Sequence, residues 1–216
     1  MLDYSIITPS FELFEPCTST NYMQFLEICA RNCYKSEEYI KEGSAEKLLA
    51  KVINNFGHYS ITEHANCIIQ FKDRWAIEEI FGMIVQYNPL IRLSWRDEET
   101  LLASGNIRMW KELLQKYPPL GKAKCRIAYG VENCLSSIWP FFFKSSEVME
   151  NKDIILLDSN PVTNCDQLTK EEMLQHMTMT GRFIMSRSAS HQLIRHRRTR
   201  LNVIDSTEVD LFQHTP

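Results

Sequence analysis

Apolar residues recur every three or four positions in several stretches of the chain, and this spacing predicts amphipathic helices. The stretches expected to be helical are 21–34, 44–56, 75–87, 106–117, 169–179 and 188–197, with 125–143 helical in part. Ser44 is placed to cap the second of these helices at its N-terminus. Gly57 stands where a helix-ending glycine belongs.

Short apolar runs predict strands between the helices. They cover residues 4–8, 65–71 and 181–186. The stretch 145–167 is polar and irregular, and we expect a surface loop there. Because helices and strands do not alternate in a strict β-α-β rhythm, the pattern favours an α+β domain.

Composition changes this picture little. The 216 residues suffice for one sizeable globular domain, and 44% hydrophobic with 24% charged residues is ordinary for a protein with a buried core. A net charge of −3 gives no global electrostatic case for binding nucleic acid or a membrane surface. The seven cysteines form no Cys-x-x-Cys pair, and no signal peptide or long apolar run is present. We expect a cytoplasmic protein.

A basic segment is the sharpest local feature. It reads Ser-His-Gln-Leu-Ile-Arg-His-Arg-Arg-Thr-Arg from Ser190 to Arg200. In a helix, Gln192, Arg195 and His196 lie within one turn of each other. Guanidinium forks beside an imidazole suit a ligand with phosphate or carbonyl oxygens. The alternative is a solvated basic face.

A second polar segment, His58–His64, joins a helix to a strand and carries Ser60 and Glu63. Its two histidines and one carboxylate do not have the i, i+4 spacing of a zinc protease, so we expect no metal. These side chains are suited to orienting a cofactor. The alternative is that they satisfy the backbone of the turn.

Together the two segments resemble the flavin-dependent thymidylate synthases (ThyX family). The match extends upstream, where Ala30–Ser36 reads Ala-Arg-Asn-Cys-Tyr-Lys-Ser, like the family's Ala-Arg-x-Cys-Tyr-Lys-Ser. The resemblance covers roughly residues 20–72 and 181–202. It implies a single domain over 1–216 with a central, mostly antiparallel sheet flanked by helices, and a largely helical insertion at about 75–180.

The resemblance also implies a reaction. Enzymes of this family transfer a one-carbon unit from methylenetetrahydrofolate to dUMP, using FAD that NADPH reduces, and assemble as homotetramers. Carried over by position, the residues expected to bind FAD are His58, Ser60, Arg195, His196, Arg197 and Asn202. The residues expected to face the nucleotide are Gln192, Arg195 and Ser206. Glu63 and His64 are expected to shape the flavin pocket.

The sequence departs from the family pattern after Arg197. The family motif runs Arg-His-Arg-x-x-Ser-x-Asn-Glu-x-Ser-x-Arg. This chain has Val203 in place of the motif's glutamate, Asp205 in place of its second serine and Thr207 in place of its last arginine. A shift by one residue restores Ser206 but puts Glu208, which would repel the nucleotide phosphate, in the arginine's place. The strand and helix that follow in the family are also expected to be lacking after Pro216.

Three interpretations remain open. The first is a working, divergent flavin-dependent enzyme, and the second is a catalytically impaired remnant that keeps the fold and FAD binding. The third, a nucleic-acid-binding protein, ranks last because the positive charge is confined to one helix. In addition, Asn106 and Arg108 resemble the Asn-x-Arg helix that follows the family motif, although Ile107, Trp110 and Leu114 also fit the buried face of an ordinary amphipathic helix.

Overall fold

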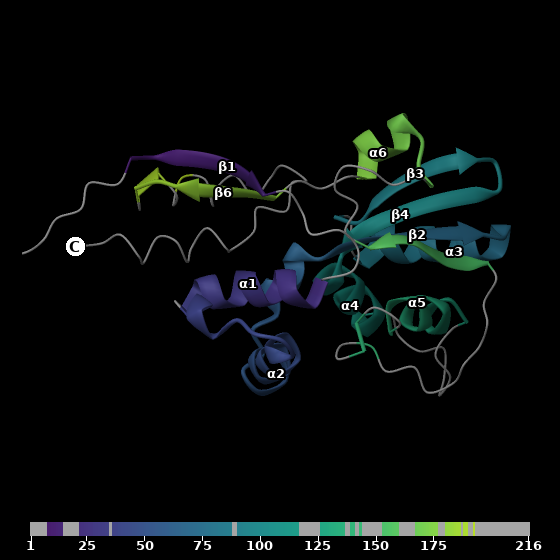
Figure 1. Ribbon diagram of the computed structural model, residues 1–216. Helices are drawn as coiled ribbons and strands as arrows, with labels where there is room; N and C mark the ends of the chain where they lie inside the picture. The colour runs from purple at the N-terminus through teal and green to yellow at the C-terminus, as the bar shows by residue number, and fades with distance from the viewer. Residues whose placement is uncertain are drawn as a thin grey trace, which may run out of the picture. The chain divides into compact units, whose positions relative to one another are not determined.

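A computed structural model describes residues 8–14, 22–34, 36–87, 90–116, 126–136, 139–140, 143, 153–159, 167–176, 180–186, 188–189 and 192 (Figure 1). Contacts between residues divide the chain into two compact units. The first unit comprises Met1–His64 and Met179–Pro216, and the second comprises Ala65–Thr178. Both contain helices and antiparallel strands, so the expected α+β class is confirmed.

Consecutive helices form most of the described part of the first unit. They are α1 (Tyr22–Tyr34), the 3-10 turn η1 (Glu37–Tyr39), α2 (Ser44–Leu49), the π-helical turn η2 (Ala50–Asn55) and the 3-10 turn η3 (Tyr59–His64). Apolar side chains at helical spacing in the predicted helices 21–34 and 44–56 are buried, among them Phe25, Leu49, Val52 and Ile53. Phe56, which continues this spacing in the second helix, is exposed because the π-helical turn widens the spacing there.

The two predicted helix signals differ in outcome. Gly57 has φ +66°, and its N–H bonds the carbonyl oxygen of Ile53 at 3.0 Å, so it ends the helix as expected. Ser44 does not cap α2, because it is the first helical residue and Gly43 occupies the cap position. The Ser44 hydroxyl instead accepts the N–H of Lys41 at 3.0 Å.

The first unit also contains a two-stranded antiparallel sheet. Its strands are β1 (Ser10–Phe14) and β6 (Thr180–Ile184), with Phe11 opposite Phe183 and their ring centroids 4.7 Å apart. Strand β6 confirms the predicted strand 181–186. The strand predicted at 4–8 lies outside the described residues except Thr8, which is not in a strand.

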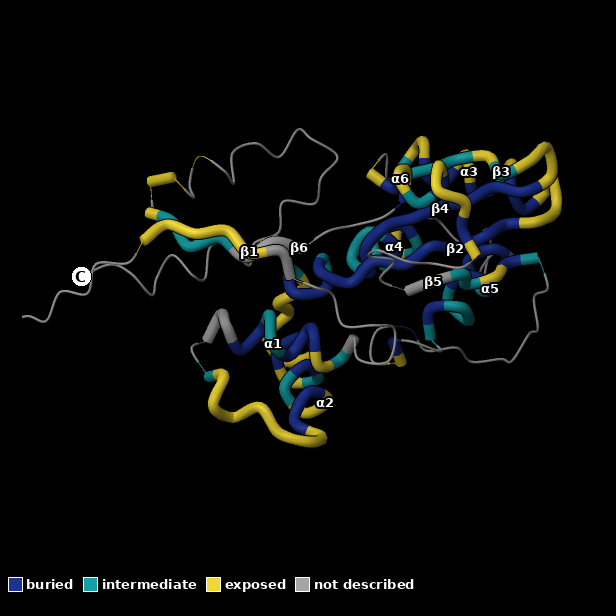
Figure 2. The backbone as a smooth tube through the Cα atoms, turned by 45° about the horizontal axis from the view of Figure 1, so that its top comes forward, coloured by how far each residue is buried: buried dark blue, intermediate teal, exposed yellow. Residues whose placement is uncertain are grey.

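The second unit is built on a four-stranded antiparallel sheet in the order β3-β4-β2-β5. The strands are β2 (Asn66–Lys72), β3 (Arg92–Asp97), β4 (Thr100–Asn106) and β5 (Ile154–Ser159). The two central strands, β2 and β4, are buried along almost their whole length, as Figure 2 shows in dark blue. A sheet with buried central strands on this scale needs cover on both faces.

Helices supply that cover (Figure 1). The helices of this unit are α3 (Arg74–Tyr87), α4 (Ile107–Lys116), α5 (Arg126–Ser136) and α6 (Lys170–His176). Helices α4 and α5 lie on the opposite side of the sheet from α6, and α3 packs with both of them. Beneath α6, Ile68 and Leu102 of the sheet form an apolar cluster with Leu168, against which Leu157 and Met173 pack.

The strands of the second unit refine the expectation for the insertion. Within the described part of residues 75–180, the helices α3, α4, α5 and α6 cover more of the chain than the strands, but β3, β4 and β5 supply three of the four strands of this sheet. Strand β5 lies in the stretch that was expected to be an irregular loop. The apolar run of β5 is only four residues long and is flanked by polar residues, so it gives a weak strand signal. Strand β3 also gives a weak signal, because it is an edge strand and carries two arginines and an aspartate.

Candidate functional site

The segment His58–His64 begins where η2 ends and forms η3. The Thr62 hydroxyl donates to the carbonyl oxygen of Tyr59 at 2.6 Å and so stabilises the turn locally. His58 and Tyr59 are exposed, and Ser60 is half-buried. The His58 ring lies 5.9 Å from the ring of Phe56, so this end of the turn presents an accessible aromatic surface.

His64, at the other end of the turn, is buried. Desolvation lowers the pKa of its imidazole to about 3, so the ring is neutral at physiological pH. This ring and the ring of Phe25 in α1 are in a T-shaped arrangement with a centroid distance of 6.2 Å. Among the described residues, Nδ1 of His64 has no hydrogen-bond partner. A neutral ring packed on an aromatic side chain is suited to an apolar wall and not to holding a phosphate.

Arg31, from the segment Ala30–Ser36, holds α1 and the following loop together. Its Nε donates to Oε1 of Glu27 at 2.6 Å, and its Nη1 donates to the carbonyl oxygen of Ser36 at 3.2 Å. The same Glu27 oxygen lies 2.6 Å from the Ser44 hydroxyl. Arg31 and Glu27 are both buried, so this motif arginine has a structural partner within the first unit.

Most of the predicted basic site lies outside the described residues. The residues of the site that the structure does not describe are Arg195, His196, Arg197, Asn202 and Ser206. Gln192 is helical and exposed. Juxtaposition of the basic segment with the turn at His58–His64 therefore stays a prediction.

Asn106 and Arg108 have local partners in the second unit. Oδ1 of Asn106 accepts the N–H of Met109 at 2.9 Å, which caps α4. Nε of Arg108 donates to Oε1 of Glu112 at 2.8 Å, one turn along the helix. Ile107 and Trp110 are fully buried, and so is Leu113 in place of the expected Leu114, so α4 is an amphipathic helix with its apolar face in the core.

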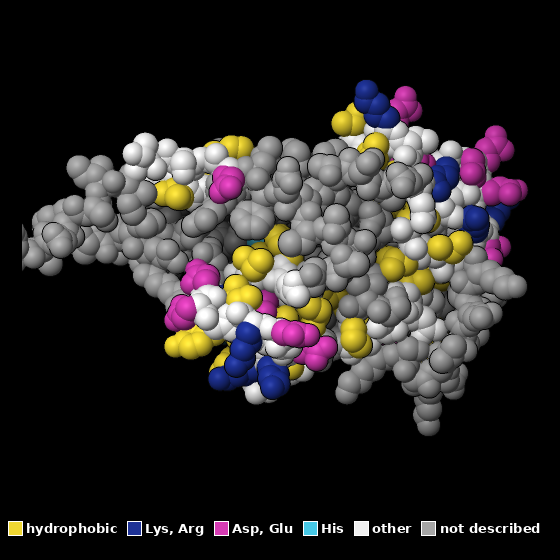
Figure 3. Space-filling view, in the orientation of Figure 1, with side chains coloured by type: hydrophobic (Ala, Val, Ile, Leu, Met, Phe, Trp, Pro, Cys, Tyr) yellow, Lys and Arg dark blue, Asp and Glu magenta, His cyan; other side chains and the backbone are white. Residues whose placement is uncertain are grey.

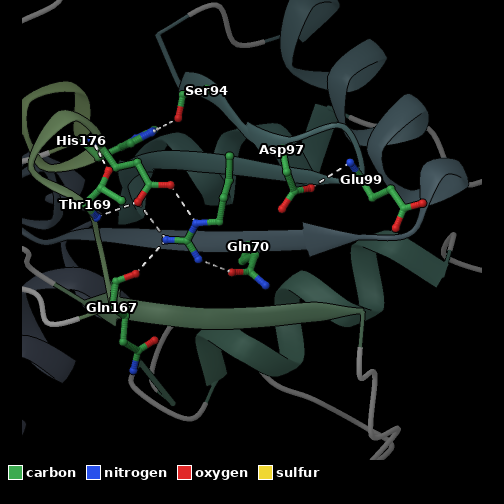
Figure 4. Close-up of polar contacts among 9 residues, drawn as sticks. Gln70, Ser94, Asp97, Glu99, Gln167, Thr169 and His176 are labelled. Carbon is green, nitrogen blue, oxygen red and sulfur yellow. Dashed lines mark hydrogen bonds and ion pairs between the residues drawn. The ribbon is translucent and has the colours of Figure 1, made fainter.

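A polar cluster that the sequence did not predict lies between α6 and the sheet (Figure 4). At its centre, Arg96 of β3 donates from Nε to Oε1 of Glu172 at 2.7 Å and from Nη2 to Oε2 at 3.0 Å. Its Nη1 donates to Oε1 of Gln70 at 2.8 Å, and its Nη2 also donates to the carbonyl oxygen of Gln167 at 2.7 Å. This paired, bidentate geometry orients the guanidinium rigidly.

Glu172 also caps α6. Its Oε2 accepts the N–H of Thr169 at 2.8 Å, and its own N–H donates to the Thr169 hydroxyl at 3.2 Å, which is a capping box. The hydrogen bond from Arg96 lowers the pKa of Glu172 to about 2, against a smaller opposing effect of desolvation. The Thr-x-x-Glu spacing was a sequence signal for this cap, but its arginine partner lies 76 residues away.

The histidine one turn further along α6 bridges two strands. Nε2 of His176 lies 2.5 Å from the Ser94 hydroxyl of β3, and Nδ1 lies 2.7 Å from the Ser104 hydroxyl of β4. Burial, with a smaller contribution from the nearby Arg92, lowers the pKa of His176 to about 4, so the imidazole is neutral at physiological pH. Neutral imidazole can donate through one nitrogen and accept through the other.

An open pocket of about 560 Å³ lies beside this cluster. Its wall includes Ser94, Trp95, Arg96, Thr169 and Glu172. The charges of Arg96 and Glu172 are paired with each other, so the pocket has no strong cationic centre. On the face in view in Figure 3, acidic and basic described side chains are interspersed, in agreement with the small net charge.

Three further findings bear on the function. Within the part that the structure describes, no three histidine, cysteine, aspartate or glutamate residues are grouped so that they could hold a metal ion. None of the described helices is both long and apolar enough to cross a bilayer. A scan against protein-family models found no match, and searches of curated proteins and of solved structures found none either.

Proposed function

We propose that this protein is a flavin-dependent thymidylate synthase-like protein. In this proposal it methylates dUMP, or a related pyrimidine nucleotide, with methylenetetrahydrofolate and reduced FAD. The observation that carries the proposal is the order of three segments: Ala30–Ser36, His58–His64 and Ser190–Arg197. The first two segments alone are weak signals and the third is fairly specific, and their combination in this order points to the family that the chain resembles.

The geometry of the turn is compatible with a flavin. His58 is exposed and Ser60 half-buried, so both are accessible to a ligand, whereas His64 offers a neutral, buried ring against Phe25. FAD would supply the hydride for the reductive step. The proposed role of Arg195, His196 and Arg197 is to hold its polar groups, because guanidinium groups bind such oxygens bidentately and stabilise developing negative charge.

A second candidate function is favoured by the residues after Arg197. Val203, Asp205 and Thr207 stand where the family has glutamate, serine and arginine, and in the shifted alignment Glu208 takes the arginine's place, where it would repel the nucleotide phosphate. This chain would then bind FAD without methylating dUMP. Both candidates share the flavin, so cofactor binding tests them together and turnover separates them.

The first experiment measures FAD on the purified full-length protein by absorbance and by titration of flavin fluorescence. We expect stoichiometric FAD in the wild type and at least tenfold weaker binding in Arg195→Ala, since a charged hydrogen-bond partner is lost. Arg198→Ala is the matched control, because it removes the same charge from the same basic run at a position without an assigned FAD contact. Equal losses in both variants, or a colourless wild type indifferent to added FAD, would contradict the flavin site.

The second experiment measures turnover. Release of tritium from dUMP labelled at C5, with methylenetetrahydrofolate and NADPH present, supports the enzyme. Growth of a thymidine-requiring strain that expresses the chain is an independent measure. FAD binding without tritium release or growth rejects the enzyme and favours the impaired protein.

A further inference from the structure

The hydrogen-bonded chain Ser94–His176–Ser104 has the arrangement of an activated serine. Ser94 lies 2.5 Å from Nε2 of His176, and Nδ1 of the same ring lies 2.7 Å from Ser104. When the ring carries its proton on Nδ1, Ser104 accepts that proton's hydrogen bond and fixes the ring. Nε2 is then left as the acceptor for the Ser94 hydroxyl proton. These are the positions of a nucleophile, a base and an orienting group.

The exposure of the three residues decreases from Ser94, the nucleophile position, to His176 and Ser104 behind it. Ser94 is half-buried and lines the open pocket of about 560 Å³. His176 and Ser104 lie behind it and are buried, with 1% and 5% of their surfaces exposed. A bridge that only fastened α6 to the sheet would not require its outermost residue to line a pocket. A nucleophile does require it, because the substrate must reach that residue.

We propose that Ser94 is a nucleophile for acyl transfer from small esters, with His176 as its base and Ser104 as the positioning residue. The Ser94 oxygen attacks the ester carbonyl carbon while its proton passes to Nε2 of His176. The bond to the leaving alkoxide then breaks, and the alkoxide takes that proton. Water hydrolyses the acyl-serine by the same proton route, so no electrons are gained or lost overall.

The pocket wall limits the substrate class. It carries one cation, Arg96, and two anions, Glu171 and Glu172, together with the exposed ring of Trp95. Because the charges sum to a net negative wall, neutral acyl groups are favoured over anionic ones. Arg96 is also neutralised by Glu172, so it stabilises an oxyanion poorly, and we expect slow turnover. With an activated ester the good leaving group makes acylation faster than hydrolysis, so the covalent adduct accumulates.

The experiment treats the full-length protein with a fluorophosphonate probe and maps the adduct by mass spectrometry. We expect one adduct at Ser94 in the wild type, no adduct in Ser94→Ala, and full labelling in Ser186→Ala, the loss of an exposed serine elsewhere. A burst of p-nitrophenolate from p-nitrophenyl acetate, about one per protein molecule, should show the same dependence. The site lies in the second unit, so these results do not depend on FAD.

Ser104 is tested separately, because it acts through the histidine. Ser104→Ala should slow labelling by roughly 10²-fold, the usual contribution of a well-placed base. Ser104→Thr, which keeps the hydroxyl, should restore most of the rate. Circular dichroism and urea midpoints establish that each variant is folded. An unlabelled wild type, or equal labelling of the wild type and Ser94→Ala, overturns the proposal, and equal rates in both Ser104 variants overturn the role of Ser104.

Discussion

At the scale of single residues, two arginine–glutamate pairs with the same i, i+4 spacing differ in their surroundings. Arg31 and Glu27 are buried with 2.6 Å between Nε and Oε1, whereas Arg74 and Glu78 are exposed with 3.0 Å between the same atoms. Glu27→Ala should lower the free energy of unfolding by about 3–5 kcal/mol, because it leaves a buried guanidinium without its counter-charge. Glu78→Ala should change it no more than the scatter of a urea titration. Similar effects of the two variants would contradict this interpretation.

Another residue-scale prediction concerns acid. Burial, with a smaller contribution from Arg92 and Arg96 against Glu172, lowers the pKa of His176 from 6.5 to about 4. As the pH falls, the unfolded chain therefore binds a proton on this imidazole before the folded chain does. The neutral buried ring contributes about 3 kcal/mol to the free energy of unfolding above pH 6.5, and this contribution disappears as the pH falls through 4.

Urea titrations between pH 7 and pH 4 test this prediction. His176→Gln should make the decline of unfolding free energy in this range less steep, while the buried His64 still contributes to it. His58→Gln, which changes an exposed ring, should leave the decline as in the wild type. An unchanged slope in His176→Gln would show that the buried imidazole does not resist protonation.

At the scale of elements, two glycines separate helix ends from helix interiors. Gly57 has φ +66° after η2, whereas Gly82 lies on the exposed face of α3, where an added Cβ atom would meet only open space. Gly57→Ala should destabilise by about 1–2 kcal/mol, because alanine is strained at positive φ. Gly82→Ala should stabilise by about 0.5–1 kcal/mol, because glycine is a poor helix former. Thermal unfolding of both variants measures the two changes in stability, which should have opposite signs. A loss of stability in Gly82→Ala would contradict the placement of Gly82 on an exposed helix face.

Elements were predictable from sequence where their own residues determined them. The helices α1, α3 and α4 each carry an apolar stripe, α6 begins at a capping box, and β2 is mostly apolar. The hairpin of β3 and β4 was missed because edge strand β3 is rich in charge, and β4 has small residues at Ala103 and Gly105. Gly105 is suited to its place because Ile91 would lie 3.1 Å from an added Cβ atom. Such strands are defined by neighbours, which local patterns do not contain.

The candidate sites divide in the same way. The turn at His58–His64 is contiguous, so its residues could be named in advance. Glu172 and Arg96 meet across 76 residues, and His176 meets Ser94 and Ser104 across 82 and 72. Only the fold brings these groups together, and apart from the Thr-x-x-Glu spacing that marks the cap at Glu172, neither a motif nor a spacing in the sequence indicates these contacts.

At the scale of the whole molecule, the second unit interrupts the first in the chain. Residues 65–178 contain the four-stranded sheet and helices on both of its faces, so they bury their own core. A continuous chain of this length is sufficient for independent folding. We therefore predict that 65–178, expressed alone, unfolds in urea in one cooperative transition that circular dichroism and tryptophan fluorescence report at the same midpoint.

A shorter fragment tests which elements this folding requires. Residues 65–152 lack β5 and α6, so Ile69 and Phe71 of β2 lose their neighbouring strand, and Arg96 loses Glu172. This fragment should unfold without a cooperative transition, because a central strand becomes an edge and a cation loses its partner. If 65–178 also lacked a cooperative transition while the full chain showed one, the sheet would depend on the first unit, and the two units would fold only together.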